Sequence, residues 1–117
     1  MNLDTPDEVR QHVENIEREC DTQKRDPDTI HRCMYLSITL GRDAAEATEE
    51  GEGFLTRYYH RNWWEGRWGP FGPPSHIIDR IQAFKEAGIQ SFVVRFCSNA
   101  QMEQLAWFTR DVWPHCR

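Results

Sequence analysis

Three features that place many short chains in a functional class are missing from this sequence. No apolar run approaches the roughly 20 residues of a membrane-spanning helix, and the acidic start lacks the basic-then-apolar layout of a secretion signal. Lys and Arg are scattered and the formal net charge is -5, so the basic surface that nucleic acid requires is absent. We therefore expect a cytoplasmic protein with no membrane and no nucleic-acid partner.

Cysteine and histidine are present, but not at the spacings of a metal or redox site. The four cysteines are Cys20, Cys33, Cys97 and Cys116, and the five histidines are His12, His31, His60, His76 and His115. None of these positions forms a CxxC, HxxxH or HExxH pattern, which zinc and thiol redox sites use to place ligands together. We expect reduced, partly buried thiols and no metal.

What is present is a composition typical of globular proteins. The chain has 117 residues, of which 38% are hydrophobic and 28% charged. This length corresponds to one domain, or to part of a larger one. No internal repeat or low-complexity tract divides it, so we treat residues 1–117 as a single segment.

The order of helical and extended patterns indicates an α/β fold. Thr5, with Glu8 three residues later, predicts a helix start, and Asp43 with Glu46 repeats the spacing. Gly88 provides a helix stop, since glycine readily adopts the left-handed conformation found after helices. The expected helices begin at Pro6, follow Asp43 towards Tyr59, run from Ser75 to Gly88, and run from near Ser98 to Pro114.

Two stretches predict β-strands. Met34–Leu40 places Met34, Leu36, Ile38 and Leu40 on one face and Tyr35, Ser37 and Thr39 on the other, as in a barrel wall with a functional interior. Gln90–Phe96 carries bulky residues on both faces, which is typical of a parallel strand covered on both sides. The predicted order is helix, strand, helix, loop, helix, strand, helix.

Two parallel strands are too little sheet to stand alone, because each leaves backbone groups unpaired at an open edge. A (β/α)8 barrel usually takes about 250 residues, so 117 residues hold less than half of one. We therefore expect a helix-rich partial TIM barrel. We also expect a homo-oligomer, or a second chain that carries the missing strands.

Most of the chain resembles the closing segment of bacterial luciferase-like monooxygenases, which are flavin- or F420-dependent barrel enzymes. The matching stretches are Gly69–Pro74, Phe84–Ile89, Phe92–Phe96 and Gln101–Pro114, and the upstream run Arg25–Ile30 with Met34–Ser37. By this resemblance the two strands correspond to the seventh and eighth of the barrel. A local departure is Pro73, where the family tends to have a Thr or Ser helix cap.

The resemblance implies FMN or F420 as the cofactor of intact relatives, in which it supports monooxygenase or oxidoreductase chemistry. The family's first two-thirds, which supply most cofactor contacts and the catalytic groups, have no counterpart here. The expectation is a C-terminal fragment of such an enzyme that is not catalytically competent alone. FMN or F420 is its expected cofactor, with no cofactor in this chain as the alternative. The alternative is a non-catalytic assembly module that self-associates or completes a partner's barrel.

The candidate cofactor-binding residues are Arg95, Ser98 and Asn99. A guanidinium on an otherwise apolar strand needs a partner, either a carboxylate on a covering helix or a phosphate. Ser98 and Asn99 follow the last predicted strand, where barrels often bind phosphate at a helix start. Simple helix capping is the alternative for this pair, and the sequence names no catalytic residue.

The loop at residues 60–74 is rich in glycine, proline and aromatic residues, so we expect an ordered aromatic loop without regular structure. Its aromatic candidates for a substrate pocket or a subunit contact are Trp63, Trp64, Trp68 and Phe71. Exposed indoles are favoured in both places. The alternative is that these rings only seal one end of the core.

Overall fold

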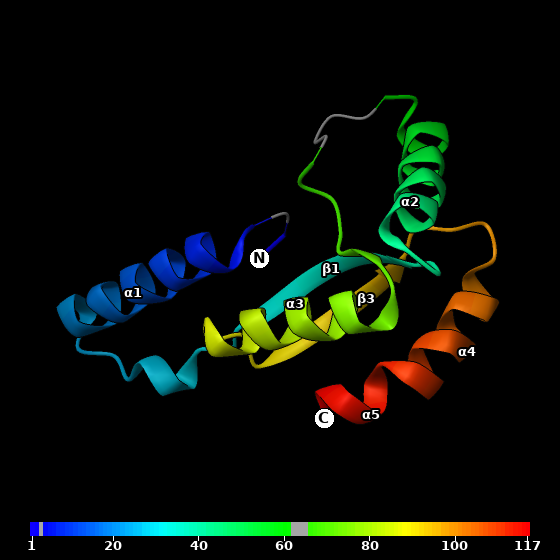
Figure 1. The fold of residues 1–117 in the computed structure, drawn as a ribbon. Helices are drawn as coiled ribbons and strands as arrows, with labels where there is room; N and C mark the ends of the chain where they lie inside the picture. The colour runs from blue at the N-terminus through cyan, green and yellow to red at the C-terminus, as the bar shows by residue number, and fades with distance from the viewer. Residues whose placement is uncertain (3, 62–65) are drawn as a thin grey trace.

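The computed structural model describes residues 1–2, 4–61 and 66–117. Within these residues it contains a three-stranded parallel sheet and five α-helices, and Figure 1 shows how the helices are arranged around the two longer strands. The elements are α1 (Pro6–Gln23), a 3-10 turn (Pro27–Thr29), β1 (Cys33–Leu40), α2 (Ala44–Tyr59), β2 (Phe71–Gly72), α3 (Pro74–Glu86), β3 (Ser91–Phe96), α4 (Gln101–Asp111) and α5 (Trp113–Cys116). The α/β class predicted from the sequence is confirmed.

The sheet has the strand order β2-β1-β3. β1 pairs with β3 over six residues, from Cys33 opposite Ser91 to Ile38 opposite Phe96. On its other side β1 pairs with β2 only at its end, where Thr39 lies opposite Phe71. Within the described chain β3 therefore has a strand neighbour on one side only, which leaves an edge able to accept another strand.

Capping hydrogen bonds stabilise two of the predicted helix boundaries, the start of α1 and the end of α3. The Thr5 side chain accepts from the Glu8 amide and the Glu8 carboxylate accepts from the Thr5 amide, which completes a capping box. After α3, Gly88 has a φ of 105°, and the Gly88 and Ile89 amides donate to the carbonyls of Lys85 and Phe84 in the Schellman arrangement. No helix in the described ranges has the length and apolar character needed to cross a membrane.

The main core lies on the face of β1 that carries Met34, Leu36, Ile38 and Leu40. These four side chains are all at most 3% exposed, and α3 and α4 cover them through Ile77, Ile81, Phe84 and Phe108. Val9 of α1 joins the same cluster. The alternation of apolar and polar residues along β1 therefore predicted the buried face correctly.

Among the residues that the structure describes, the opposite face of the sheet is covered mainly at its C-terminal end. There α2 packs through Ala47 and Leu55 against Phe71 and Cys97. Towards the N-terminal ends of β1 and β3, Val93 is 52% exposed and Tyr35 is 38% exposed. The prediction that β3 is covered on both faces therefore holds only near Arg95, which lies against aromatic rings of α2. It is wrong at Val93, because α3 and α4 both pack on the Met34 side.

The predicted loop at residues 60–74 contains a short strand that the sequence did not indicate. The Thr39 amide donates to the Pro70 carbonyl at 3.3 Å, and the Gly41 amide donates to the Gly72 carbonyl at 3.1 Å. Strand pairing of this kind uses backbone groups alone, so Phe71–Gly72 pairs without a periodic pattern of its own. The sheet thus has three strands within the described residues, and not two.

The last predicted helix begins later and ends earlier than expected. Ser98 does not cap it: the Ser98 side chain accepts from the Ala100 amide, and α4 begins at Gln101 with Ala100 as its N-cap. The turn after β3 uses the hydroxyl that the prediction assigned to the helix. α4 ends at Asp111, three residues before Pro114, which cannot donate a helical hydrogen bond, and α5 follows as a separate turn.

The overall shape is long and flat. The extents are 47 × 33 × 20 Å and the Cα radius of gyration is 15.6 Å, whereas a compact domain of this length has a radius of about 13 Å. α1 lies at the end of the molecule away from α2 (Figure 1). The described chain is thus less compact than a self-contained domain.

An ion pair joins α1 to the segment before β2, and its pH dependence is testable. The Arg67 guanidinium donates to Glu8 at 2.6 Å. This bond and the Thr5 amide lower the pKa of Glu8 from 4.5 to about 2. Because the folded pKa is depressed, the stabilisation is present above pH 4.5 and is lost as pH falls towards 2. Glu8→Gln should melt at a lower temperature at neutral pH and converge with wild type near pH 2.

Thermal unfolding of both proteins across this pH range measures the effect. Glu17→Gln, on the same helix and without a bond to Arg67, is the control, and we expect it to follow wild type. A constant difference between Glu8→Gln and wild type at every pH would contradict the proposed role of the ion pair.

Candidate functional site

The face of the sheet opposite the main core carries a small set of side chains, which we call the inner face: Tyr35, Ser37, Val93 and Arg95. Tyr35 lies opposite Val93 and Ser37 opposite Arg95 in the register of β1 and β3. Paired residues project to the same side of a sheet. The inner face is therefore the side on which the sequence placed a barrel interior.

Arg95 is surrounded by aromatic side chains of α2. Its Nη1 donates to the Tyr59 hydroxyl at 2.8 Å. Its Cζ lies 5.7, 4.7 and 5.5 Å from the ring centres of Phe54, Tyr58 and Tyr59, close enough for cation–π attraction. No carboxylate within the described residues forms an ion pair with Arg95. Of its two predicted partners, the acid on a covering helix is therefore not found there.

Ser37 has a buried hydroxyl group without a hydrogen bond. The residue is 3% exposed, and its Oγ has no partner of normal geometry in the part of the chain described. It lies beside the Cys97 thiol, which is a weak hydrogen-bonding group. Burial raises the pKa of Cys97, although Ser37 and Arg95 act in the opposite direction. The thiol therefore stays protonated at neutral pH and leaves Ser37 without a strong partner.

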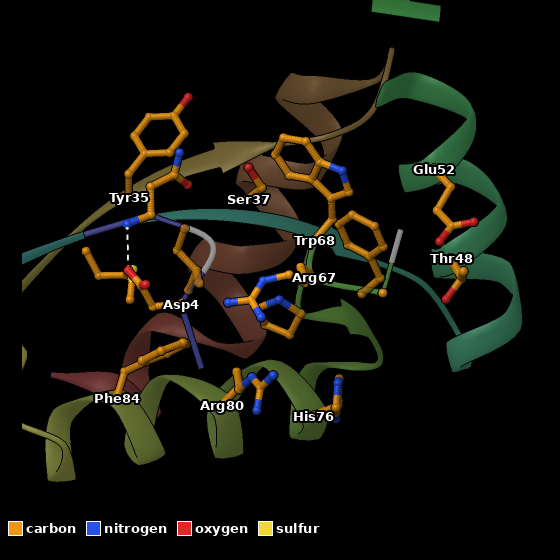
Figure 2. A pocket seen from close by; sticks show the side chains of 17 residues that line it. Asp4, Tyr35, Ser37, Thr48, Glu52, Arg67, Trp68, His76, Arg80 and Phe84 are labelled. Carbon is orange, nitrogen blue, oxygen red and sulfur yellow. Dashed lines mark hydrogen bonds between the residues drawn. The ribbon is translucent and has the colours of Figure 1, made fainter. Parts of the chain in front are cut away.

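A pocket of about 230 Å³ opens beside Ser37, along the edge of β1 opposite β3 (Figure 2). Its wall includes Trp68 on the inner-face side, and His76 and Arg80 of α3 on the other side of the strand. Pockets that enclose drug-sized ligands usually measure roughly 300 to 1,000 Å³. The pocket is thus too small to enclose a whole flavin, and it is suited to one end of a larger ligand.

The turn at Ser98 and Asn99 is already occupied by groups of the protein. The Asn99 amide donates to Glu50 at 3.2 Å, and the Ser98 hydroxyl accepts from the Ala100 amide at 3.0 Å. Both residues line a shallow hollow that also contains Phe54. A phosphate at this turn would have to displace the Glu50 carboxylate, so the predicted phosphate site requires a rearrangement.

The aromatic candidates separate into different positions. Trp63 and Trp64 lie outside the described residues. Trp68 stacks on Tyr59, with ring centres 5.9 Å apart and planes 18° apart, so it extends the aromatic cluster around Arg95. Phe71 is 9% exposed and belongs to the small core under α2. Both rings line the pocket, and Trp68 packs against the small core that contains Phe71, so the pocket role and the core role are combined in these two residues.

Tyr59 was not among the site residues predicted from the sequence. A single tyrosine belongs to no recognisable motif, but Tyr59 follows Phe54 and Tyr58 along one helix. The four-residue spacing brings the rings of Phe54 and Tyr58 together on α2, and the ring of Tyr59 contacts that of Tyr58. That clustering was visible in the sequence, whereas its contact with Arg95 was not. Within the described residues no group of three or more His, Cys, Asp and Glu side chains is placed to hold a metal ion.

Comparisons with known proteins leave the family open and support the fold. No protein-family model and no curated protein matches the chain. Among solved structures, the chain is similar to an F420-dependent secondary alcohol dehydrogenase in complex with an F420-acetone adduct, with a TM-score of 0.74 and 16% identity. The match covers 99% of this chain and 42% of that chain. The chain thus shares an α/β fold with less than half of that enzyme, and at this identity the likeness concerns the fold alone.

Proposed function

We propose that this chain is the C-terminal part of a luciferase-like oxidoreductase barrel and acts only when further strands complete the sheet. β1 and β3 form two neighbouring strands of the wall, and the inner face lines the interior. The missing strands come from another copy or from a separate chain. By this proposal the isolated chain is not a competent enzyme.

The observation that carries the proposal is the exposure of Val93 and Tyr35 on the inner face, together with the open strand edge of β3. Val93 has 52% of its surface exposed. An exposed apolar side chain next to an unpaired strand edge is unfavourable on the surface of a complete protein, because an unpaired edge tends to pair with another strand. The fold similarity agrees with this interpretation, because all but 1% of the chain matches a portion of a larger oxidoreductase.

FMN or F420 is the cofactor class that the proposal implies. When bound, a reduced flavin activates O2 and a deazaflavin such as F420 transfers a hydride. The residue that fits such a group at one end is Arg95, whose guanidinium bonds the Tyr59 hydroxyl and has no acid partner within the described ranges. The role of the chain is then to bind and orient the anionic end of the cofactor and to exclude water from it.

Mass and absorbance in solution test the proposal together. Size-exclusion chromatography with light scattering should give a dimer or larger species, because the open edge of β3 requires a neighbour. The purified protein should be yellow, or should melt at a higher temperature when FMN or F420 is added, since a ligand that binds the folded state stabilises it.

The possible outcomes separate the two functions. A colourless oligomer that is indifferent to both cofactors would support the alternative, a non-catalytic assembly module. A protein that stays monomeric at every concentration and ignores both cofactors would contradict the proposal that the sheet is completed by a second chain.

A further inference from the structure

The backbone groups at the open edge of β3 can be identified from the bonds on its other side. The Cys97 amide donates to the Ile38 carbonyl at 2.8 Å, towards β1. Successive residues of a strand direct their amide and carbonyl groups to opposite edges of the sheet. The alternate residues Phe92, Val94 and Phe96 therefore direct these groups away from β1, to the edge that has no strand neighbour in the described chain.

The free part of this edge is short and lies around Val93. At its C-terminal end the Gln101 side chain donates to the Phe96 carbonyl at 3.4 Å, so that carbonyl already has a partner. Phe92 and Val94, on either side of Val93, each direct one donor and one acceptor outwards. Such a stretch is complementary to a strand of its own sequence that runs in the opposite direction.

β3 lacks the features that protect strand edges from pairing with other strands. Proteins often place Lys or Pro on an edge or keep the edge strand very short. β3 has six residues, SFVVRF, with no Lys and no Pro. Its one charged residue, Arg95, lies near the end of the strand against Tyr58 and Tyr59 of α2. The sequence of β3 therefore does not oppose pairing with a second copy of itself.

Apolar surface adjoins the same edge on both faces of the sheet. On the inner face, Val93 is 52% exposed. On the other face there is a hollow of about 440 Å³, whose lining includes Phe92, Val94, Phe108 and Trp113, and Trp113 is 51% exposed. A strand added at this edge would cover Val93 and bring its own side chains next to the hollow.

We propose that two copies of this chain pair antiparallel through β3, with a twofold axis at Val93, and form one continuous sheet. In this register the amide and carbonyl of Phe92 bond those of Val94 in the second copy, so that every group of the free stretch has a partner. The inference rests on the proposed function, which it deepens by naming the partner that completes the sheet: a second copy of this chain.

An axis at Val94 is less favourable for two reasons. It would require the Phe96 carbonyl, which already accepts from Gln101. It would also place Arg95 opposite Val93 of the second copy and bring the two guanidinium groups nearer to each other, whereas an axis at Val93 moves them apart. Because like charges close together across strands are destabilising, the hydrogen bonds and the charges favour the same register.

The first experiment uses cysteine cross-linking, because a residue on the axis lies opposite itself. In this register Val93 forms a non-hydrogen-bonded pair with Cα atoms about 4.5 Å apart, within the roughly 4.4 to 6.8 Å of a disulfide. Val93→Cys treated with oxidised glutathione should run as a disulfide-linked dimer on a non-reducing gel. Val94→Cys should not, since Val94 lies opposite Phe92 of the second copy.

Two controls measure cross-linking that does not depend on the β3 pair. Wild type has four cysteines at other positions, and Met102→Cys places a thiol on α4 at a position that is 75% exposed. Val93→Cys that cross-links no faster than Met102→Cys would overturn the proposal. Faster cross-linking of Val94→Cys than of Val93→Cys would show that the register is wrong.

The second experiment places a charge on the axis. Val93→Lys should raise the dimer dissociation constant several-fold, because two ammonium groups would lie directly opposite each other. Val93→Thr, which keeps a β-branched side chain without charge, should dimerise like wild type. Sedimentation at a series of concentrations measures both constants, and thermal unfolding confirms that each variant is folded. Equal dissociation constants for the two variants would contradict the proposed pairing.

The pairing and the proposed function fail in different ways. If Val93→Cys cross-links as expected while neither FMN nor F420 changes the melting temperature, the β3 pair stands and the oxidoreductase assignment fails. If a cofactor raises the melting temperature while Val93→Cys cross-links no faster than the controls, the oxidoreductase assignment stands and the β3 pair is wrong.

Discussion

Replacing Gln104 by Leu should lower the free energy of unfolding by about 3 kcal/mol or more, because two buried backbone groups lose their partners at about 1 to 3 kcal/mol each. Gln104 is 8% exposed. Its Oε1 accepts from the Leu40 amide at 2.7 Å, and its Nε2 donates to the Leu40 carbonyl at 2.9 Å. A domain is stable by only about 5 to 15 kcal/mol, so the loss is a large fraction of the total.

The Leu40 backbone needs the Gln104 side chain as a partner because β3 is shorter than β1. The pairing between β1 and β3 ends where the Cys97 amide donates to the Ile38 carbonyl, so Leu40 extends past its neighbour strand. The amide side chain of α4 then replaces a strand at that point. Urea unfolding measured for Gln104→Leu, with the exposed Gln82→Leu as the matched control, separates this loss from a general effect of an apolar substitution.

Gln104→Glu distinguishes hydrogen bonding from packing. Its carboxylate can accept from the Leu40 amide, but it cannot donate to the Leu40 carbonyl until it is protonated. We expect this variant to be strongly destabilised at neutral pH and to recover relative to wild type in acid. If Gln104→Leu and wild type unfold at the same urea concentration, the side chain contributes no satisfied hydrogen bonds to β1.

The second large effect is expected at Gly51, where α2 crosses the sheet. A Cβ added there would lie 2.6 Å from the Thr39 Oγ1 and 2.9 Å from the ring of Phe71. Alanine favours helices over glycine by about 0.5 to 1 kcal/mol, but the overlap should reverse the sign. We expect Gly51→Ala to destabilise the protein by about 1 to 3 kcal/mol, the usual range for overpacking a close contact.

Gly53 provides the matched control two residues along the same helix. A Cβ at Gly53 would meet only the guanidinium of Arg57, at 3.2 Å, and that flexible group can move. Gly53→Ala should therefore stabilise by about 0.5 to 1 kcal/mol through helix propensity. Chemical unfolding of both variants gives the comparison, and equal effects at the two positions would show that α2 does not press against Thr39 and Phe71.

Local patterns were enough to predict most elements of this fold. The caps at Thr5 and Asp43 and the stop at Gly88 act within a few residues of themselves. Thr5 and Gly88 have the expected contacts; at Asp43 the side chain accepts from the Glu46 amide, but the Glu46 carboxylate accepts from the Arg42 amide and does not complete a capping box. The alternation in β1 identified the buried face, because burial of apolar side chains follows directly from side-chain polarity. The short β2 was missed, since it pairs through backbone groups that every residue possesses.

The candidate site was predicted less completely. Arg95 was recognisable as a cation on an apolar strand, but its aromatic neighbours come from a helix about 40 residues earlier. The unsatisfied hydroxyl of Ser37 likewise depends on which groups lie around it after folding. The carboxylate of Glu50 at the Asn99 amide is a contact of the same long-range kind.

The sequence by itself determined the order of helices and strands and the side of β1 that is buried, because capping and hydrophobic periodicity act between near neighbours. Only the tertiary structure decided which residues meet on the inner face and which partner each polar group has. Those contacts join segments tens of residues apart, and their geometry is set by how α2 and the sheet pack together.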